Sequence, residues 1–232
     1  MTRLKIAQAL VVATWCLLLT PSEGWGIGTI MTEAKSGSDN KPAAEASGSG
    51  TRSPQVGQFA PDIKWTDAKG KKHALMEMTK QSKVVLLVLR GWPGYQCGIC
   101  NRQVAQFIGQ KEKFESMGAQ VVMIYPGPAE LLVDHAKQFQ GDRVFEGAFH
   151  YVIDPGYGFT NAWNLRWDAP RETAYPATYI LGEGNKVEFA NVSKTHGGRV
   201  KAGRVLKELA KSSAAMNGSQ QKGSTEKGSA AK

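Results

Sequence analysis

A run of six apolar residues, 84–89, constrains the fold more than any other feature of this 232-residue chain. The run, Val-Val-Leu-Leu-Val-Leu, follows Lys83 and is rich in β-branched side chains. Such a run is typical of a strand that is buried on both faces, as in a parallel sheet covered by helices on each side. We therefore expect residues 83–89 to form a central strand.

Helical and strand patterns alternate after this run. The expected elements are a helix over 100–117, a strand over 120–125, a helix over 131–139, a strand over 149–153, a hairpin of 177–181 with 186–191, and a last helix over 200–210. Each helix has apolar residues on one face, and Gly118 supplies the end of the first. Strands that alternate with helices imply parallel pairing through right-handed crossovers. The sequence thus predicts an α/β fold, a central mixed sheet flanked by helices.

The two ends of the chain differ in composition from the middle. Residues 1–24 have two basic side chains, then an apolar stretch of 11 residues and then small residues, which is the pattern of a signal peptide. Residues 25–52 and 211–232 are mostly small or polar, too polar to offset the entropy of ordering. We interpret 25–52 as a flexible linker and 211–232 as a disordered basic tail. The folded domain is then residues 53–210.

The predicted signal peptide, residues 1–24, here called the leader, also indicates the cellular location of the protein. Its apolar stretch is shorter than the roughly 20 residues that cross a bilayer, so a membrane anchor is the weaker alternative. Lipid modification of Cys16 is disfavoured because the preceding Trp15 is bulky. Cleavage of the leader leaves a secreted or periplasmic protein with no stable membrane span and two cysteines, Cys97 and Cys100, in an oxidising compartment.

The net charge of +9 raises the question of nucleic-acid binding. Residues 1–24 and 211–232 together carry four of these charges. The rest of the chain has no run of Lys and Arg interleaved with aromatic residues, which a nucleic-acid groove would use. We therefore expect no nucleic-acid partner.

Cys97 and Cys100 form a C-x-x-C motif between the buried strand and the first helix. The start of a helix offers free backbone N–H groups and a positive dipole end to a thiolate. This position lowers a cysteine pKa from about 8.5 into a range of roughly 3.5 to 7.5, giving a nucleophile for disulfides or peroxides. An inert disulfide and half of a zinc site are the alternatives. A zinc site needs a second ligand pair, and the four histidines are scattered, so we expect no cofactor.

Motifs around this pair resemble the alkyl hydroperoxide reductase and thiol-specific antioxidant family, in a peroxiredoxin-like branch of the thioredoxin-fold proteins. Residues 56–62 are similar to its opening V-G-x-x-A-P-D, and 67–71 to its D-x-x-G-K turn. The family motif P-x-x-x-T-x-x-C falls on Pro93, Cys97 and Cys100. The resemblance implies a thioredoxin-like fold, with Cys100 in the peroxide-attacking slot. Cys97 takes the threonine slot, where thioredoxins have their attacking cysteine.

A second stretch departs from the peroxidase pattern. Peroxiredoxins place an arginine before a strand R-x-x-F-I-I-D, and the matching position here is Pro176. Thioredoxin-like oxidoreductases have a cis-proline at this place, so the resemblance implies a cis Tyr175–Pro176 bond beside the disulfide. An ordinary trans proline at a strand edge is the alternative. Arg90 and Arg166 are candidates for the missing charge, with a surface ion pair as the alternative for Arg166.

Three side chains near the motif or the last helix are further candidates. Trp92 and Tyr95 flank the cysteines and either shape the approach of the substrate or pack in the core. His196 lies in a turn-rich stretch, where it is either solvated or close enough to the disulfide to move protons.

These observations predict an oxidoreductase that cycles Cys97 and Cys100 between dithiol and disulfide. In the leading interpretation Cys97 attacks a protein or small-molecule disulfide and Cys100 resolves the mixed disulfide. In the alternative, Cys100 reduces a hydroperoxide and Cys97 resolves the sulfenic acid. Either cycle needs an external thiol electron donor. A Cu(I) metallochaperone is the minor alternative.

Overall fold

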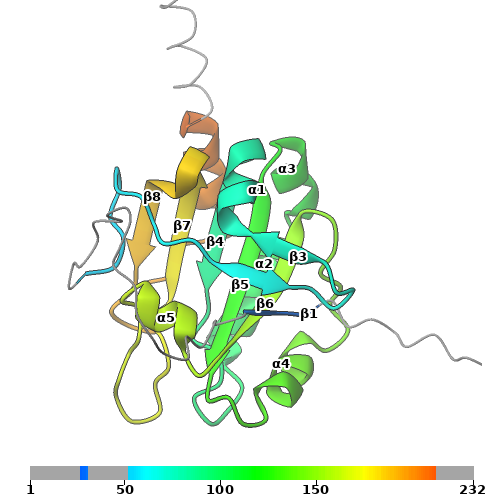
Figure 1. The fold of residues 1–232 in the computed structure, drawn as a ribbon, viewed down its shortest axis with the longest axis vertical. Coiled ribbons are helices and arrows are strands. Elements are labelled where there is room, and N and C mark those ends of the chain that lie inside the picture. The colour runs from blue at the N-terminus through cyan, green and yellow to red at the C-terminus, as the bar shows by residue number, and fades with distance from the viewer. Residues whose placement is uncertain (1–26, 31–51, 213–232) are drawn as a thin grey trace, which may run out of the picture.

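The computed structural model describes residues 27–30 and 52–212 (Figure 1). The predicted leader, most of the predicted linker and nearly all of the predicted tail lie outside these residues. The elements are β1 Ile27–Ile30, β2 Lys64–Thr66, β3 Lys72–Ala74, α1 Leu75–Gln81, β4 Val84–Val88, α2 Gly98–Ile108, α3 Lys111–Ser116, β5 Gln120–Gly127, α4 Leu132–Gln140, β6 Phe149–Pro155, α5 Gly158–Ala162, β7 Ala177–Gly182, a 3-10 turn Glu183–Asn185 and β8 Lys186–Val192. A further helix, the C-terminal helix, covers 202–212.

The sheet confirms the predicted mixed topology. Within the described residues it has eight strands in the order β3-β2-β1-β6-β5-β4-β7-β8. Strands β4, β5 and β6 are parallel neighbours, and β1 is parallel to β6. Strands β7 and β8 are antiparallel additions at one end, and β2 and β3 at the other. The predicted hairpin is therefore β7 and β8.

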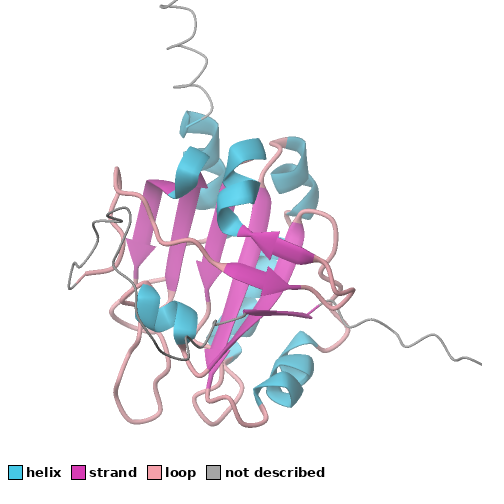
Figure 2. Ribbon diagram, viewed as in Figure 1, coloured by secondary structure: helices cyan, strands magenta, loops and turns pink. Residues whose placement is uncertain are grey.

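Strand β4 lies inside the sheet and is buried on both faces, as its apolar run predicts. Val85 and Leu87 pack with α2, α3, α4 and the C-terminal helix. Val84, Leu86 and Val88 point to the other face and pack with α1 and α5. Figure 2 shows the sheet between these two layers of helices. Because β4 lies inside the sheet, its last residue is in the middle of the molecule. The loop that follows it packs on the face of the sheet that α2 and α4 cover.

The predicted helix over 100–117 is two helices in the structure. Helix α2 ends at Ile108, Gly109 caps it, and α3 begins at Lys111. The break does not disturb the apolar face, because Phe107 and Phe114 still stack with ring centroids 5.5 Å apart. Periodicity alone did not reveal the break, since the apolar residues lie on one side of both helices. Strands β2 and β3 and helices α1 and α5 are short elements that we did not predict.

Strand β1 corrects the predicted linker, because residues 27–30 belong to the sheet and not to a flexible segment. The strand pairs with β6 on one side and with β2 on the other. Gly28 allows this close packing, since a Cβ there would lie 2.6 Å from the indole Cδ1 of Trp65. Four residues carry too little periodicity to be recognised against a polar background.

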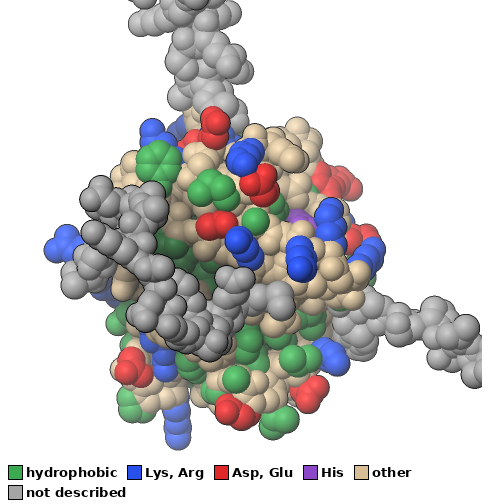
Figure 3. Space-filling view, in the orientation of Figure 1, with side chains coloured by type: hydrophobic (Ala, Val, Ile, Leu, Met, Phe, Trp, Pro, Cys, Tyr) green, Lys and Arg blue, Asp and Glu red, His purple; other side chains and the backbone are tan. Residues whose placement is uncertain are grey.

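One face of the molecule carries charges of both signs. On the face drawn in Figure 3, Lys and Arg side chains are interspersed with Asp and Glu and do not form one continuous basic area. In the part of the chain that the structure describes, no helix is long and apolar enough to cross a membrane.

Candidate functional site

The C-x-x-C motif follows a loop that crosses the end of β5. The N–H of Trp92 donates to the carbonyl of Pro126 at 2.9 Å. Gly91 has a φ of +71°, and a Cβ at this position would overlap the Pro126 carbonyl oxygen. Glycine is therefore required here both by the backbone conformation and by the close approach to β5. The contact fixes where the loop turns toward α2.

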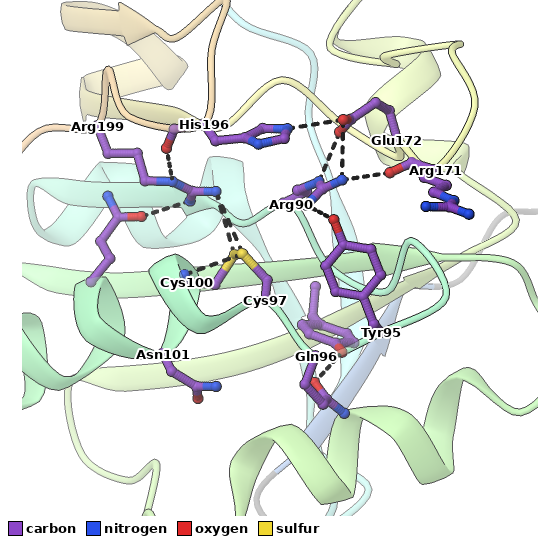
Figure 4. Close-up of a disulfide and its surroundings, with 12 residues drawn as sticks. Arg90, Tyr95, Gln96, Cys97, Cys100, Asn101, Arg171, Glu172, His196 and Arg199 are labelled. Carbon is purple, nitrogen blue, oxygen red and sulfur yellow. Dashed lines mark hydrogen bonds and ion pairs between the residues drawn. A yellow bond between two sulfur atoms is a disulfide. The ribbon is translucent and has the colours of Figure 1, made fainter.

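Cys97 and Cys100 form a disulfide at the N-terminus of α2, as the sequence predicts (Figure 4). Cys97 is the N-cap residue, and its Sγ accepts the backbone N–H of Cys100 at 3.2 Å. The side chains differ in access, because Cys97 is 4% exposed and Cys100 is 0% exposed. The N–H groups and dipole of the helix thus face the sulfur of Cys97, the residue of the pair that is not completely buried.

A guanidinium group lies against both sulfurs. Nη2 of Arg199 is 3.4 Å from Sγ of Cys100 and 3.9 Å from Sγ of Cys97. The other nitrogens of Arg199 are anchored, Nε on the carbonyl of His196 at 3.0 Å and Nη1 on Oε1 of Gln103 at 2.9 Å. Loss of water and the nearby charge of Arg90 lower the pKa of Arg199 to about 10. It remains a cation at neutral pH and favours a thiolate on either sulfur.

Arg90 forms a second cationic centre that is neutralised by Glu172. Its Nε donates to Oε2 of Glu172 at 2.7 Å and its Nη2 to Oε1 at 3.1 Å. Nη1 donates to the hydroxyl of Tyr95 at 2.6 Å, and Nη2 also donates to the carbonyl of Arg171. Nε2 of His196 lies 2.9 Å from Glu172 Oε1. The carboxylate therefore joins the loop before α2 to the loop that carries Arg199.

Helix α4 holds the other side of the loop. The indole of Trp92 stacks on the ring of His135 with centroids 3.6 Å apart. The amide nitrogen of Gln96 donates to the carbonyl of His135 at 2.9 Å, and its oxygen accepts the hydroxyl of Tyr125 at 3.0 Å. Tyr95, 45% exposed, lies on the solvent side of the site. These contacts fix the residue before Cys97 and leave Tyr95 exposed beside the disulfide.

A sequence profile of the AhpC/TSA family matches residues 56–190, which is more than half of the chain. The chain belongs to the AhpC/TSA family. A comparison with curated proteins finds no significant match.

Solved structures confirm the thioredoxin-like fold of this AhpC/TSA protein. Reduced Prx3 of Vibrio vulnificus, solved in complex with hydrogen peroxide, is 18% identical with a TM-score of 0.54, over 67% of this chain and 99% of that chain. Peroxiredoxin 5 of Alvinella pompejana is 15% identical with a TM-score of 0.52, over 68% and 99%. The mitochondrial 2-Cys peroxiredoxin of Plasmodium falciparum is 15% identical with a TM-score of 0.51, over 68% and 93%. At these identities the similarity concerns the fold alone.

The expected cis-proline is wrong. None of the described residues follows a cis peptide bond, so Tyr175–Pro176 is trans in this AhpC/TSA protein. Ala174 pairs with Arg166, and β7 starts at Ala177, so a trans bond keeps the chain extended between these pairings. Pro176 is buried, and its carbonyl accepts the N–H of Ser193 at 2.8 Å. The resemblance implied a cis bond at Pro176, and the structure corrects this to trans.

The cation at the sulfurs was also missed, because it is Arg199 and not Arg90 or Arg166. Arg166 extends over the ring of Tyr157 and donates to the carbonyls of Trp167 and Thr173, each at 2.6 Å. Its pair with the exposed Asp168, at 3.4 Å, is the predicted surface ion pair. Arg166 thus shapes the loop before β7.

The remaining candidates have the following positions. Pro93 is partly buried in the loop between Trp92 and Gly94. The side chain of His196 is 39% exposed, its ring contacts Glu172, and its carbonyl orients Arg199. Among the described residues, no group of three or more His, Cys, Asp or Glu side chains could hold a metal ion.

Proposed function

We propose that this AhpC/TSA protein is a thiol–disulfide oxidoreductase in which Cys97 exchanges with the substrate and Cys100 resolves the mixed disulfide. Membership of the AhpC/TSA family supports an oxidoreductase. The observation that carries the assignment of Cys97 is its place at the N-cap of α2, with its sulfur on the Cys100 N–H and with the exposed surface of the pair. Cys97 is thus the residue of the pair that keeps some solvent exposure, and the helix N-terminus stabilises its sulfur as an anion.

The exchange proceeds in two balanced steps. The Cys97 thiolate attacks one sulfur of a substrate disulfide, forms a mixed disulfide and releases the other substrate sulfur as a thiolate. The Cys100 thiolate, next to Arg199, then attacks Cys97 Sγ, closes the pair and releases the second substrate sulfur. In this direction two electrons pass from the protein to the substrate, and the same two steps run in reverse when the disulfide oxidises a dithiol. An external thiol donor returns the two electrons in a reducing cycle. The proposal draws nothing from Pro176, since its peptide bond is trans.

Hydroperoxide reduction is the second candidate, and the position of Arg199 favours it. Its Nη2 is closer to Cys100 than to Cys97, and Cys100 is in the peroxide-attacking slot of the family motif. In this reaction the Cys100 thiolate attacks the O–O bond, releasing an alcohol or water and leaving a sulfenic acid. The Cys97 thiol then condenses with it and releases water. We rank this candidate second because Cys100 has no solvent exposure, whereas Cys97 keeps 4%.

We place the protein outside the cytoplasm, secreted or periplasmic. The supporting pattern is the leader, residues 1–24, with basic residues before an apolar stretch and small residues after it. An oxidising compartment keeps a C-x-x-C pair available as a disulfide.

Single cysteine variants separate the two candidates. We expect Cys100→Ser to accumulate mixed disulfides through Cys97 with a disulfide-bonded polypeptide substrate, because the resolving sulfur is gone. Cys97→Ser should lose disulfide exchange completely. Non-reducing gels and mass spectrometry of the trapped peptides provide the measurement.

The same variants, treated with hydrogen peroxide, test the second candidate, hydroperoxide reduction. If peroxide reduction is the main activity, Cys97→Ser will consume one equivalent of hydrogen peroxide rapidly and carry a sulfenic acid on Cys100, detected with dimedone. That result, together with no trapped mixed disulfide in Cys100→Ser, would reverse the ranking of the two functions. A Cys97→Ser/Cys100→Ser variant is the control for reactions at other residues.

A further inference from the structure

Arg199 has no carboxylate partner, although it is partly buried. Among the described residues it takes part in no salt bridge within 4.0 Å, whereas Arg90 is paired with Glu172. Its polar partners are two neutral oxygens, the His196 carbonyl and the Gln103 amide, and the sulfurs of a disulfide that carries no charge. The Glu172 carboxylate is already shared by Arg90 and His196. In the disulfide form the guanidinium charge is therefore uncompensated.

Reduction changes the charge balance at this place. A dithiol can lose a proton and become a thiolate, and the anion then lies within 3.4 to 3.9 Å of the Arg199 nitrogen. The N-terminus of α2 stabilises the same anion through the Cys100 N–H. Removing the anion from a partly buried ion pair leaves an unpaired charge, which is unfavourable. Arg199 thus stabilises the reduced form and destabilises the disulfide form relative to it.

We propose that the Cys97–Cys100 disulfide is an oxidant that introduces disulfides into dithiol substrates, with Arg199 as the positioning residue that sets this direction. The inference rests on the proposed function: it keeps Cys97 as the exchanging cysteine, assigns the reverse direction of the two exchange steps as the favoured one, and names the substrate class. A protein or peptide with two free cysteines is such a substrate. A disulfide whose reduced form is stabilised has a more oxidising potential.

The chemistry of the transfer agrees with the asymmetry of the site. A substrate thiolate attacks Sγ of Cys97, the less buried residue of the pair, and Cys100 leaves as a thiolate beside Arg199. A stabilised thiolate is the better leaving group. The second substrate thiolate then attacks the substrate sulfur of the mixed disulfide and releases Cys97 as a thiolate at the helix N-terminus. The substrate loses two electrons and two protons, and the protein's own disulfide accepts the two electrons in one turnover.

The redox equilibrium with reduced and oxidised glutathione at pH 7 tests the direction. We expect Arg199→Met to lower the equilibrium constant for reduction at least tenfold, a potential change of about 30 mV for two electrons. Arg199→Lys retains the charge and should fall between Arg199→Met and wild type. Arg102→Met removes an exposed guanidinium from α2, the helix that begins at the cysteines, and is the matched control, with an expected change of less than about twofold. Equal constants for Arg199→Met and Arg102→Met would overturn the inference.

Thermal unfolding of the two redox forms provides a second measurement that needs only the wild-type protein. We expect the reduced protein to unfold at a temperature at least as high as the disulfide form, and Arg199→Met to reverse this order. A wild-type disulfide form that is clearly the more stable would contradict the inference, even if Arg199→Met fails to fold. A different result contradicts the proposed function itself: wild-type protein that does not exchange with glutathione at all. If the protein exchanges with glutathione but the equilibrium constant does not depend on Arg199, only the inferred direction of electron flow is contradicted.

Discussion

Replacing Arg90 with Met is expected to lower the free energy of unfolding by about 3 to 5 kcal/mol, since it breaks a buried ion pair by removing one partner. The Arg90 side chain is 5% exposed and that of Glu172 is 11% exposed. Without Arg90 the carboxylate keeps the ring of His196 as a polar contact but loses its guanidinium partner, and the Tyr95 hydroxyl and the Arg171 carbonyl lose their donor. Urea unfolding followed by circular dichroism measures the change.

A matched variant shows whether burial causes the effect. Lys80→Met also removes one partner of an ion pair, but Lys80 and Glu77 are 56% and 63% exposed. We expect a loss below about 1 kcal/mol for this exposed pair. Adding Glu172→Gln to Arg90→Met should recover part of the stability, because no uncompensated carboxylate remains. Equal losses for Arg90→Met and Lys80→Met would mean that the pair does not hold the loop in place.

Gly91→Ala is expected to destabilise the fold by about 2 to 5 kcal/mol, combining overpacking of about 1 to 3 kcal/mol with the strain of a left-handed alanine of about 1 to 2 kcal/mol. The new methyl group would overlap the Pro126 carbonyl, which accepts the N–H of Trp92. The loop can relieve this overlap only by moving away from β5. We therefore also expect slower disulfide exchange in any Gly91→Ala protein that folds.

Gly94→Ala separates the strain of a positive φ from the steric overlap of a new methyl group. Gly94 has a φ of +102° in the same loop, but a Cβ there would have no atom within 4 Å. We expect Gly94→Ala to cost only about 1 to 2 kcal/mol, the strain alone. Thermal and urea unfolding of both variants provide the comparison. If Gly91→Ala is no worse than Gly94→Ala, the close approach of the loop to β5 is not a determinant of the fold.

The parts of the fold that the sequence predicted are those with a local signal. The apolar run of β4 identifies a strand with two buried faces, and the spacing of Cys97 and Cys100 indicates the disulfide at the start of α2. Both features depend only on neighbouring residues. Local periodicity missed the break at Gly109 and strand β1, because one lies within a continuous apolar face and the other is four residues long.

The surroundings of the disulfide could not be predicted in the same way. Glu172 and Arg199 lie 82 and 109 residues after Arg90 in the chain, and the fold brings their loops together beside the cysteines. No sequence pattern within either loop reveals that the two loops lie close together in the folded protein. The charge expected near the cysteines from the resemblance is present, but on Arg199, a residue that the family motif does not include. The isomer of Pro176 likewise depends on how the flanking backbone is paired.

The accessibility and charge of Cys97 test the central claim most directly, through alkylation of the reduced protein with iodoacetamide followed by mass spectrometry of the separate cysteines. At about pH 6.5, two pH units below the ordinary thiol pKa of about 8.5, we expect rapid alkylation of Cys97 and at least tenfold slower alkylation of Cys100. The N-cap position and exposed surface of Cys97 are the reasons for this order. Preferential alkylation of Cys100, or no reaction of either cysteine below about pH 8, would contradict the assignment of Cys97 as the attacking residue.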